Sequence, residues 1–514
     1  MRISIAETHR REALGKQATG LPKTAVVALF IWFIIISFVI TGYRHIYGGN
    51  HPFQLVLVQK LNDPTLYPND PLADTVYAYA SAFWYVVAWL SRVADLSLVL
   101  FMFFLVTKFL FLLAGFRLGR TFFPDSRYAP VIGLIVMATF PQLLFGNGYP
   151  TRDTNQTVLC LGTLFLALDA FLNKNWKNFV FWLGLSLNLN FMFSVYGITY
   201  LAASWLLYLR KAATTEFLRK SVVALAGSAL IGSFGIYLVL RASTNKEYNP
   251  IFAWQACELS YAYHFYPHLW EIGNQLIALL LAAAVVFVVY RFQDASPVGT
   301  HLIAWTGVAL AWYLLAWSNI LHIHSLLLLQ LHPVRALTLW QLAAMVFLAG
   351  FIVHLVQNAK IVLNRSTLWI HCVLITLIVF LDKSLRHILS VVPLVTSVVL
   401  CEIGRRVFLR RTSNSAAALL TIVAVLTVSI TAPGILLGST LANKKSIFVI
   451  FQEPGIQIAE WASKNTSRDS VFLIPLSSDG GWAIFRHISQ RSVFTHEKDG
   501  SAWTYAPWFA EEWL

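Results

Sequence analysis

Residues 42–77 read GYRHIYGGNHPFQLVLVQKLNDPTLYPNDPLADTVY, and they follow the first long apolar segment directly. The stretch is too polar to remain in lipid, and its Pro, Gly and Asn residues do not suit a transmembrane helix. It holds three acids, Asp63, Asp70 and Asp74, in a chain where charge is scarce. We therefore predict a long loop outside the membrane and expect any chemistry of the chain there.

The composition indicates a membrane protein. Of the 514 residues, 57% are hydrophobic and only 12% are charged, whereas soluble domains carry roughly 25% charged residues. The apolar residues come in many blocks near the length of about 20 residues that crosses a bilayer. The formal net charge of +14 comes from basic residues that lie mostly in short loops between these blocks, as the positive-inside rule requires. The basic residues are therefore expected to set topology and contact membrane lipids, and they do not indicate nucleic acid.

Apolar run lengths predict an all-α polytopic fold of about 13 transmembrane helices, with every strong basic cluster on the side of the N-terminus. Residues 1–23 are expected to be cytoplasmic, 24–437 to form the transmembrane domain, and 438–514 to form a small extracytoplasmic α/β domain. Outer loops are predicted at 42–95, 146–155, 242–273 and 318–335. Single helices are predicted at 24–41, 96–116, 129–145, 156–172, 222–240, 275–290, 302–317, 336–357, 367–381, 388–403 and 415–437.

Three segments refine this scheme. The aromatic, amphipathic run Thr75–Leu90 predicts a helix on the membrane surface, because Arg92 follows at once. Phe179–Leu209 is long for one crossing and has a polar centre, so it predicts a hairpin of two short helices. In the tail, Pro454–Ser463 has helical spacing, whereas SVFLIP, AIFRHIS and RSVFTH resemble short strands.

The acids of the long loop are the candidate catalytic groups, since a carboxylate above the membrane can act as a general base or hold a divalent cation. Asp70 lies between two prolines in LYPNDP, which fix its backbone, although it could equally cap its own turn. Asp63, in NDP, is a second candidate that a turn would also explain. Asp74 fits the N-cap of the surface helix.

Two arginines are the candidate phosphate ligands. Arg152 and Asp153, in YPTRDTNQT, could bind phosphate and a metal or acceptor hydroxyl, or Asp153 could cap the helix predicted from residue 156. Arg335, in LQLHPVRAL beside His332, opens a helix at the outer boundary, where a guanidinium must be paired or reach water. It could bind a lipid phosphate bidentately or extend to headgroups.

Motifs for cofactors are scarce. No Walker, GxSxG or HExxH motif occurs, and the four cysteines form no CxxC or His-spaced pair. No histidine cluster has the spacing of metal ligands, so no metal site is predicted, while the requirement for a divalent cation is left open.

The layout resembles the GT-C superfamily of polytopic glycosyltransferases: one helix from a cytoplasmic N-terminus, an acid-bearing outer loop with a surface helix, many more helices and an outer C-terminal domain. More narrowly, the chain resembles a bacterial GT-C-like family through NHPFQLVLVQKLNDPTLYPNDPL, LQLHPVRAL, IAEWASKNTSRDSVFLIP and FRHISQRSVFTHEKDG. The resemblance implies an inner-membrane protein of the cell envelope that transfers sugar from a polyprenyl-phosphate carrier, its lipid-linked donor, to an extracytoplasmic acceptor.

One position departs from the family. GT-C enzymes usually carry a catalytic acid soon after the first helix, often in an acidic pair, and this chain has Gly49, Asn50 and His51 there. The base would then be Asp70 or Asp63, with His51 counted among the substrate-binding candidates. Two alternatives stay open, a transporter or flippase that uses Lys108 or Asp169 within the membrane, and a non-catalytic GT-C-like protein.

Overall fold

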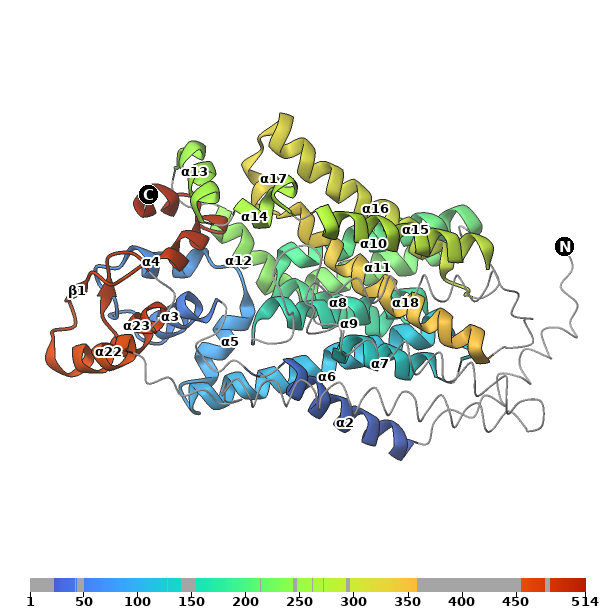
Figure 1. Ribbon diagram of the computed structural model, residues 1–514, viewed down its shortest axis with the longest axis horizontal. Coiled ribbons are helices and arrows are strands. Elements are labelled where there is room, and N and C mark those ends of the chain that lie inside the picture. Colours follow the sequence, from blue (N-terminus) through green and yellow to red (C-terminus); the bar gives the residue numbers. More distant parts are fainter. Residues whose placement is uncertain are drawn as a thin grey trace, which may run out of the picture.

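The computed structural model describes residues 23–41, 43, 50–126, 128–139, 154–212, 214–243, 247–260, 262–270, 272–292, 296–357, 454–476 and 481–514. Its helices form an elongated bundle, and the loop and C-terminal elements gather at one end of it (Figure 1). We call this the loop end. The opposite end, here the basic end, carries Arg117, Arg120, Lys177, Arg210, Arg219, Lys220 and Arg291.

The bundle consists of long apolar helices. They are α2 (Lys23–Thr41), α6 (Leu96–Phe122), α7 (Ala129–Thr139), α8 (Gln156–Leu172), α9 (Trp176–Leu189), α10 (Phe191–Ala212), α11 (Thr215–Ile231), α12 (Ser233–Ser243), α15 (Ile272–Arg291), α16 (Gly299–Ser318) and α18 (Leu337–Gln357). Within the described residues, five helices are long and apolar enough to span a bilayer, or six if the bent pair α11–α12 is one span. The chain is thus an integral membrane protein. The helices predicted beyond residue 357 lie outside the described residues, so the number 13 stays a prediction.

Most predicted helices between residues 24 and 357 are present, and one is broken. The segment 179–209 forms the expected hairpin, with Asn190 between α9 and α10. The helix expected at 222–240 is instead α11 and α12, bent by 65° at Gly232. Asn188 satisfies the backbone at this break: its amide donates to the Ile231 carbonyl at 2.8 Å and accepts from the Gly235 N–H at 2.8 Å.

The loop end contains helices that the sequence did not indicate. Its elements are α3 (His51–Asn62), α4 (Pro71–Asp74), η1 (Thr75–Ala78), α5 (Ala82–Leu90), α13 (Pro250–Ser260), α14 (Ala262–Phe265), η2 (Pro267–Leu269), η4 (Asn319–Ile323), α17 (Leu326–Gln330) and η5 (Pro333–Ala336). Residues His51–Val58 of α3 are all buried, so this helix has no amphipathic period by which it could be recognised. The surface helix expected from Thr75 begins only at Ala82, as α5.

The C-terminal segment is built from short pieces. They are α22 (Pro454–Asn465), β1 (Val471–Phe472), η6 (Trp482–Ile484), α23 (Phe485–Ser489), β2 (Ser492–Val493), η7 (Glu497–Thr504) and α24 (Phe509–Trp513). Strands β1 and β2 form a parallel pair, whereas AIFRHIS is helical and the strand expected there is wrong. Ala502, Ala506 and Phe509 share one core with Phe53 and Leu72 of the long loop. The segment therefore packs on the loop end.

Helices α6 and α7 touch backbone to backbone at Gly115 and Gly133. A Cβ atom on either residue would overlap the carbonyl oxygen of the other, and no side-chain rotation could relieve the overlap. The glycines thus permit a close approach that any other residue would prevent. By contrast, a Cβ on Gly307 of α16 would meet nothing within 4 Å.

We expect Gly133→Ala to destabilise the protein by roughly 1–3 kcal/mol, because the helices must separate. Gly307→Ala, the matched control, should leave stability unchanged or raise it by about 0.5–1 kcal/mol through helix propensity. Thermal unfolding of the purified full chain measures both changes. Equal midpoints for the two variants would contradict the close contact.

Candidate functional site

Arg335 is held at the loop end by the backbone on either side of it. Two tyrosines, one turn apart on α10, bind this segment: Tyr196 donates to the carbonyls of Leu331 and His332, the latter at 2.9 Å, and Tyr200 donates to that of Ala336 at 3.0 Å. His332 has a left-handed backbone, with φ of 44°, and Pro333 follows it in η5. The turn that presents Arg335 is thereby fixed.

The Arg335 side chain is partly exposed, and its charge interacts with the phenols of Tyr79, Tyr196 and Tyr263. It forms no ion pair with any carboxylate of the described residues. An unpaired guanidinium at the boundary of a membrane bundle is costly unless water or an anion reaches it. The position can therefore receive an anionic group.

Tyr79 adds a hydroxyl donor beside this charge. Trp84 donates to Gln156 Oε1 at 2.9 Å, which turns the amide nitrogen of Gln156 toward the Tyr79 hydroxyl. Gln54 also donates to this hydroxyl, at 3.0 Å. Because the Tyr79 oxygen accepts both bonds, its own proton is left to point elsewhere. Burial raises the pKa of Tyr79, which keeps that proton in place at neutral pH.

Buried polar groups with few partners line the same region. Neither ring nitrogen of the buried His332 has a hydrogen-bond partner within the described residues, and the ring lies on Phe265 with 3.9 Å between centroids. The buried Trp503 N–H also has none there. Burial lowers the pKa of His264 to about 2, and the charges of Arg335 and Lys498 act in the same direction. His264 is thus neutral, and the local potential is positive.

The C-terminal segment forms one wall of this region. Tyr505 packs edge-on against Tyr79 with 4.6 Å between ring centroids, and Trp503 lies 5.2 Å from Phe265. Glu497, an exposed acid at the start of η7, interacts electrostatically with Tyr263. The segment thus brings aromatic rings and one carboxylate to the surroundings of Arg335.

Asp70, the predicted base, lies in a buried ion triad with Arg486 and Asp499. Its Oδ2 accepts from Arg486 Nε at 2.6 Å and from the Val493 N–H at 2.9 Å, while Oδ1 caps α4 through the Leu72 N–H at 3.1 Å. Arg486 binds Asp499 with both terminal nitrogens, each at 2.7 Å. The predicted turn cap is present, together with partners that are more than 400 residues away in the sequence.

Burial raises the pKa of Asp70, which the charge of Arg486 opposes. Burial alone would lower the pKa of Arg486, but Asp499 and Asp70 outweigh it and raise that pKa above its ordinary value. Only 1% of Asp70 is exposed, so its carboxylate is enclosed by the contacts that hold the C-terminal segment on the loop.

The other predicted residues are placed as follows. Asp63 accepts from the Thr65 backbone and hydroxyl at 3.0 and 2.6 Å and lies 3.5 Å from Arg468, on the surface. His51 is buried, with Nε2 2.6 Å from the Thr154 carbonyl. Arg152 and Asp153 lie outside the described residues. The N-cap of α8 is Asn155, whose Oδ1 accepts from the Val158 N–H at 3.0 Å.

Across the described part of the chain, no three His, Cys, Asp or Glu side chains come together as a metal ion requires. Sequence reasoning missed Tyr79, Gln54, Gln156, Arg486 and Asp499. Because charged residues are rare in this chain, their scarcity could have marked Arg486 and Asp499 as candidates for a buried ion pair. No local sequence pattern distinguishes Gln54 and Gln156 from other glutamines.

Comparison with known proteins gives a family model for a short segment and similar solved structures. Residues 453–514 match a family model described as a domain of unknown function, DUF6798. No curated protein matches the chain. Two crystal structures of the Archaeoglobus fulgidus oligosaccharyltransferase are similar to this chain, each at 13% sequence identity. The apo form has a TM-score of 0.47 over 91% of this chain. The form tethered to an acceptor peptide containing the NVT sequon has a TM-score of 0.43 over 92% of this chain. The chain covers 64% of each of these structures.

Replacing Arg486 by Met should destabilise the protein by roughly 3–5 kcal/mol, because two buried carboxylates lose their cation. Limited proteolysis should then release the C-terminal segment. Arg468→Met is the matched control, since it breaks an exposed ion pair to the same loop, and it should change neither readout. Thermal unfolding and proteolysis at equal protease concentration measure the difference; a C-terminal segment that stays protected in Arg486→Met would refute the triad as its anchor.

Proposed function

We propose that the chain is a membrane glycosyltransferase-like protein that takes a sugar from a polyprenyl-phosphate carrier and transfers it to an extracytoplasmic acceptor. One observation carries this proposal: Arg335 stands on a turn fixed by Tyr196 and Tyr200 at the loop end and has no carboxylate partner in the described structure. Arginine suits phosphate because its planar fork matches two phosphate oxygens. A lipid-borne phosphate would approach at the same depth as this side chain.

The surroundings of Arg335 support a sugar as the remainder of the ligand. Tyr263 and Tyr79 interact with the arginine, Tyr505 packs on Tyr79, and Tyr263 is 52% exposed. Rings of this kind provide faces on which a sugar can stack. The buried nitrogens of His332 and Trp503 would supply polar contacts, because buried polar atoms in proteins nearly always have a partner.

The architecture supports the proposed membrane setting. Loop helices and the C-terminal segment share one end (Figure 1). The opposite end carries the basic residues named above with few acids, whereas most of the acids of the described residues lie at the loop end. Under the positive-inside rule the basic end is cytoplasmic and the loop end extracytoplasmic. This orientation, a GT-C-like fold and a bacterial inner-membrane location belong to the proposal.

The identity of the base is also a proposal. Asp70 could act only by leaving Arg486, so we assign it a positioning role. Asp63 stays a candidate for the base, since it lies on the surface and its pair with Arg468 is exposed. Glu497 is exposed and its charge reaches Tyr263, which also interacts with Arg335. We therefore propose Glu497 as a catalytic candidate, and Arg152 and Asp153 as further ligands of the substrate.

A second function, binding of the lipid-linked sugar without catalysis, is favoured by the enclosure of Asp70. Transport has less support. Lys108 donates to the Ser37 hydroxyl at 3.0 Å, and Asp169 pairs with Arg117 at 3.0 Å. Within the described part of the chain, both groups are therefore engaged with near neighbours.

Arg335→Gln should abolish complementation of a deletion strain and lower sugar transfer by at least about tenfold, since a charge-assisted hydrogen bond contributes roughly 1.5–3 kcal/mol. A lipid-linked sugar should accumulate while one surface glycan is lost. Arg241→Gln, which removes a cation that lies over the Tyr77 ring near the same end, should complement fully. Lipid extracts and surface polysaccharides of the strains provide the measurement.

Two further variants separate the hypotheses. If Glu497 is the base, Glu497→Gln accumulates the donor although the folded protein is present at the normal level, whereas Asp70→Asn loses activity only in proportion to folded protein. Full complementation by Glu497→Gln would exclude it as the base. Full complementation by Arg335→Gln would overturn the proposed function.

A further inference from the structure

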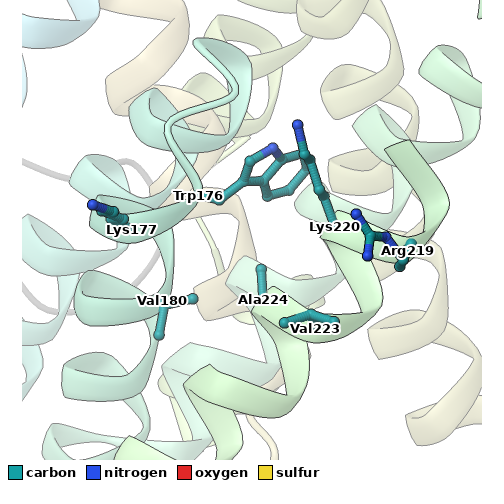
Figure 2. A pocket seen from close by; sticks show the side chains of 7 residues that line it. All are labelled: Trp176, Lys177, Val180, Arg219, Lys220, Val223 and Ala224. Carbon is teal, nitrogen blue, oxygen red and sulfur yellow. The ribbon is translucent and has the colours of Figure 1, made fainter. Parts of the chain in front are cut away.

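A groove at the basic end lies between α9 and α11. Figure 2 shows the seven side chains that line it, and its volume is about 610 Å³. They are Trp176, Lys177 and Val180 of α9, and Arg219, Lys220, Val223 and Ala224 of α11. Nothing in the proposed transfer reaction, which takes place at the other end of the bundle, uses this groove.

The groove follows from how the two helices pack. They approach closely toward the loop end, where a Cβ on Gly184 would lie 3.0 Å from the Ser228 carbonyl oxygen and one on Gly227 would lie 3.2 Å from Val180. Nearer the basic end, the large Trp176 and the long basic side chains replace these glycines. Trp176 is held by Phe171, Phe179 and Phe217, with ring centroids 5.6–6.1 Å away.

The rim of the groove is cationic. Lys177, Arg219 and Lys220 are all exposed, and Lys220 binds the exposed Glu216 at 2.6 Å. Three positive charges and this one negative charge leave a net charge of +2 at the rim. Trp176 adds an indole N–H, which makes no hydrogen bond within the described residues. The rim thus offers several donors and a positive potential to an anion.

The floor of the groove opens onto apolar surface. Val223 is 65% exposed, and Val222 and Leu230 of the same helix are 61% and 76% exposed. Since α11 and α12 together are long and apolar enough to span a bilayer, these side chains face lipid. An occupant of the groove therefore needs both an anionic head and an apolar tail.

We propose that this groove binds an anionic phospholipid, with the headgroup phosphate among Lys177, Arg219, Lys220 and the Trp176 N–H. One acyl chain lies along Val180 and Val223. Tryptophan and basic residues are the side chains that anchor proteins at the headgroup level of a membrane. A free phosphate would match the rim but not the apolar floor, which is why the lipid is the favoured source of the anion.

The test compares two triple variants of the full chain. The groove variant carries Lys177→Gln, Arg219→Gln and Lys220→Gln, and the control carries Arg120→Gln, Arg210→Gln and Arg291→Gln, three basic residues of the same end outside the groove. Native mass spectrometry counts phosphatidylglycerol and phosphatidylcholine bound from equimolar mixtures. The groove variant should lose preference for phosphatidylglycerol by at least about tenfold, since each basic residue near an anionic surface contributes on the order of 1 kcal/mol. The control should retain it.

Further variants separate charge from fold. A Lys177→Arg, Arg219→Lys, Lys220→Arg triple keeps the charge and should keep the preference. Trp176→Phe keeps the ring packing, loses the N–H and should reduce the preference by about threefold. Equal loss in the groove and control variants, or loss in neither, would overturn the proposal. So would displacement of the lipid by inorganic phosphate at constant ionic strength, because the site would then be one for the free anion.

Discussion

The buried contact of Arg486 with Asp70 and Asp499 is the constraint on which the loop end depends. It joins a loop that follows the first helix to a segment more than 400 residues later, and Asp70 also holds the backbone of Val493 and Leu72. One arginine between two carboxylates leaves the triad with an excess negative charge when all three are ionised. Buried ions of this kind contribute little net stability, because desolvation offsets their attraction, but removing one partner is costly. The triad therefore specifies where the C-terminal segment sits more than it adds to stability.

That placement has consequences for the region around Arg335. The segment that Arg486 anchors continues into η7, from which Trp503 and Tyr505 reach Phe265 and Tyr79. The arginine itself is fixed from the other side, by two tyrosines of α10 that bind backbone carbonyls. Because these bonds go to the backbone, the N–H groups of the guanidinium are not used to hold the turn and can donate to a ligand. The loop end is thus assembled from three distant parts of the chain, and no one of them contains the whole region.

This assembly explains what the sequence could and could not predict. Helices whose bounds follow from the length of an apolar run could be predicted. Helix α8 spans 156–172 as expected, and the α9–α10 hairpin turns at Asn190, as its polar centre indicated. Helix α3 was missed because it is buried on all sides, and the break at Gly232 because Asn188, on another helix, satisfies it. The cap formed by Asp70 is local and was foreseen as an alternative, whereas its ion pair depends on tertiary contacts that no pattern in LYPNDP encodes.

The two ends of the bundle use positive charge in physically different ways. At the loop end one guanidinium stands on a turn whose carbonyls are tied down, beside phenols and neutral histidines. Such a group has lost most of its freedom before any ligand arrives, which favours recognition of one defined anion. At the basic end several long side chains project from helices into solvent, where each keeps its rotamer freedom and is screened by salt. That arrangement suits orientation of the protein in the membrane and contact with a mobile lipid surface. It becomes selective for one kind of lipid only where the charges line a groove of defined shape, such as that between α9 and α11.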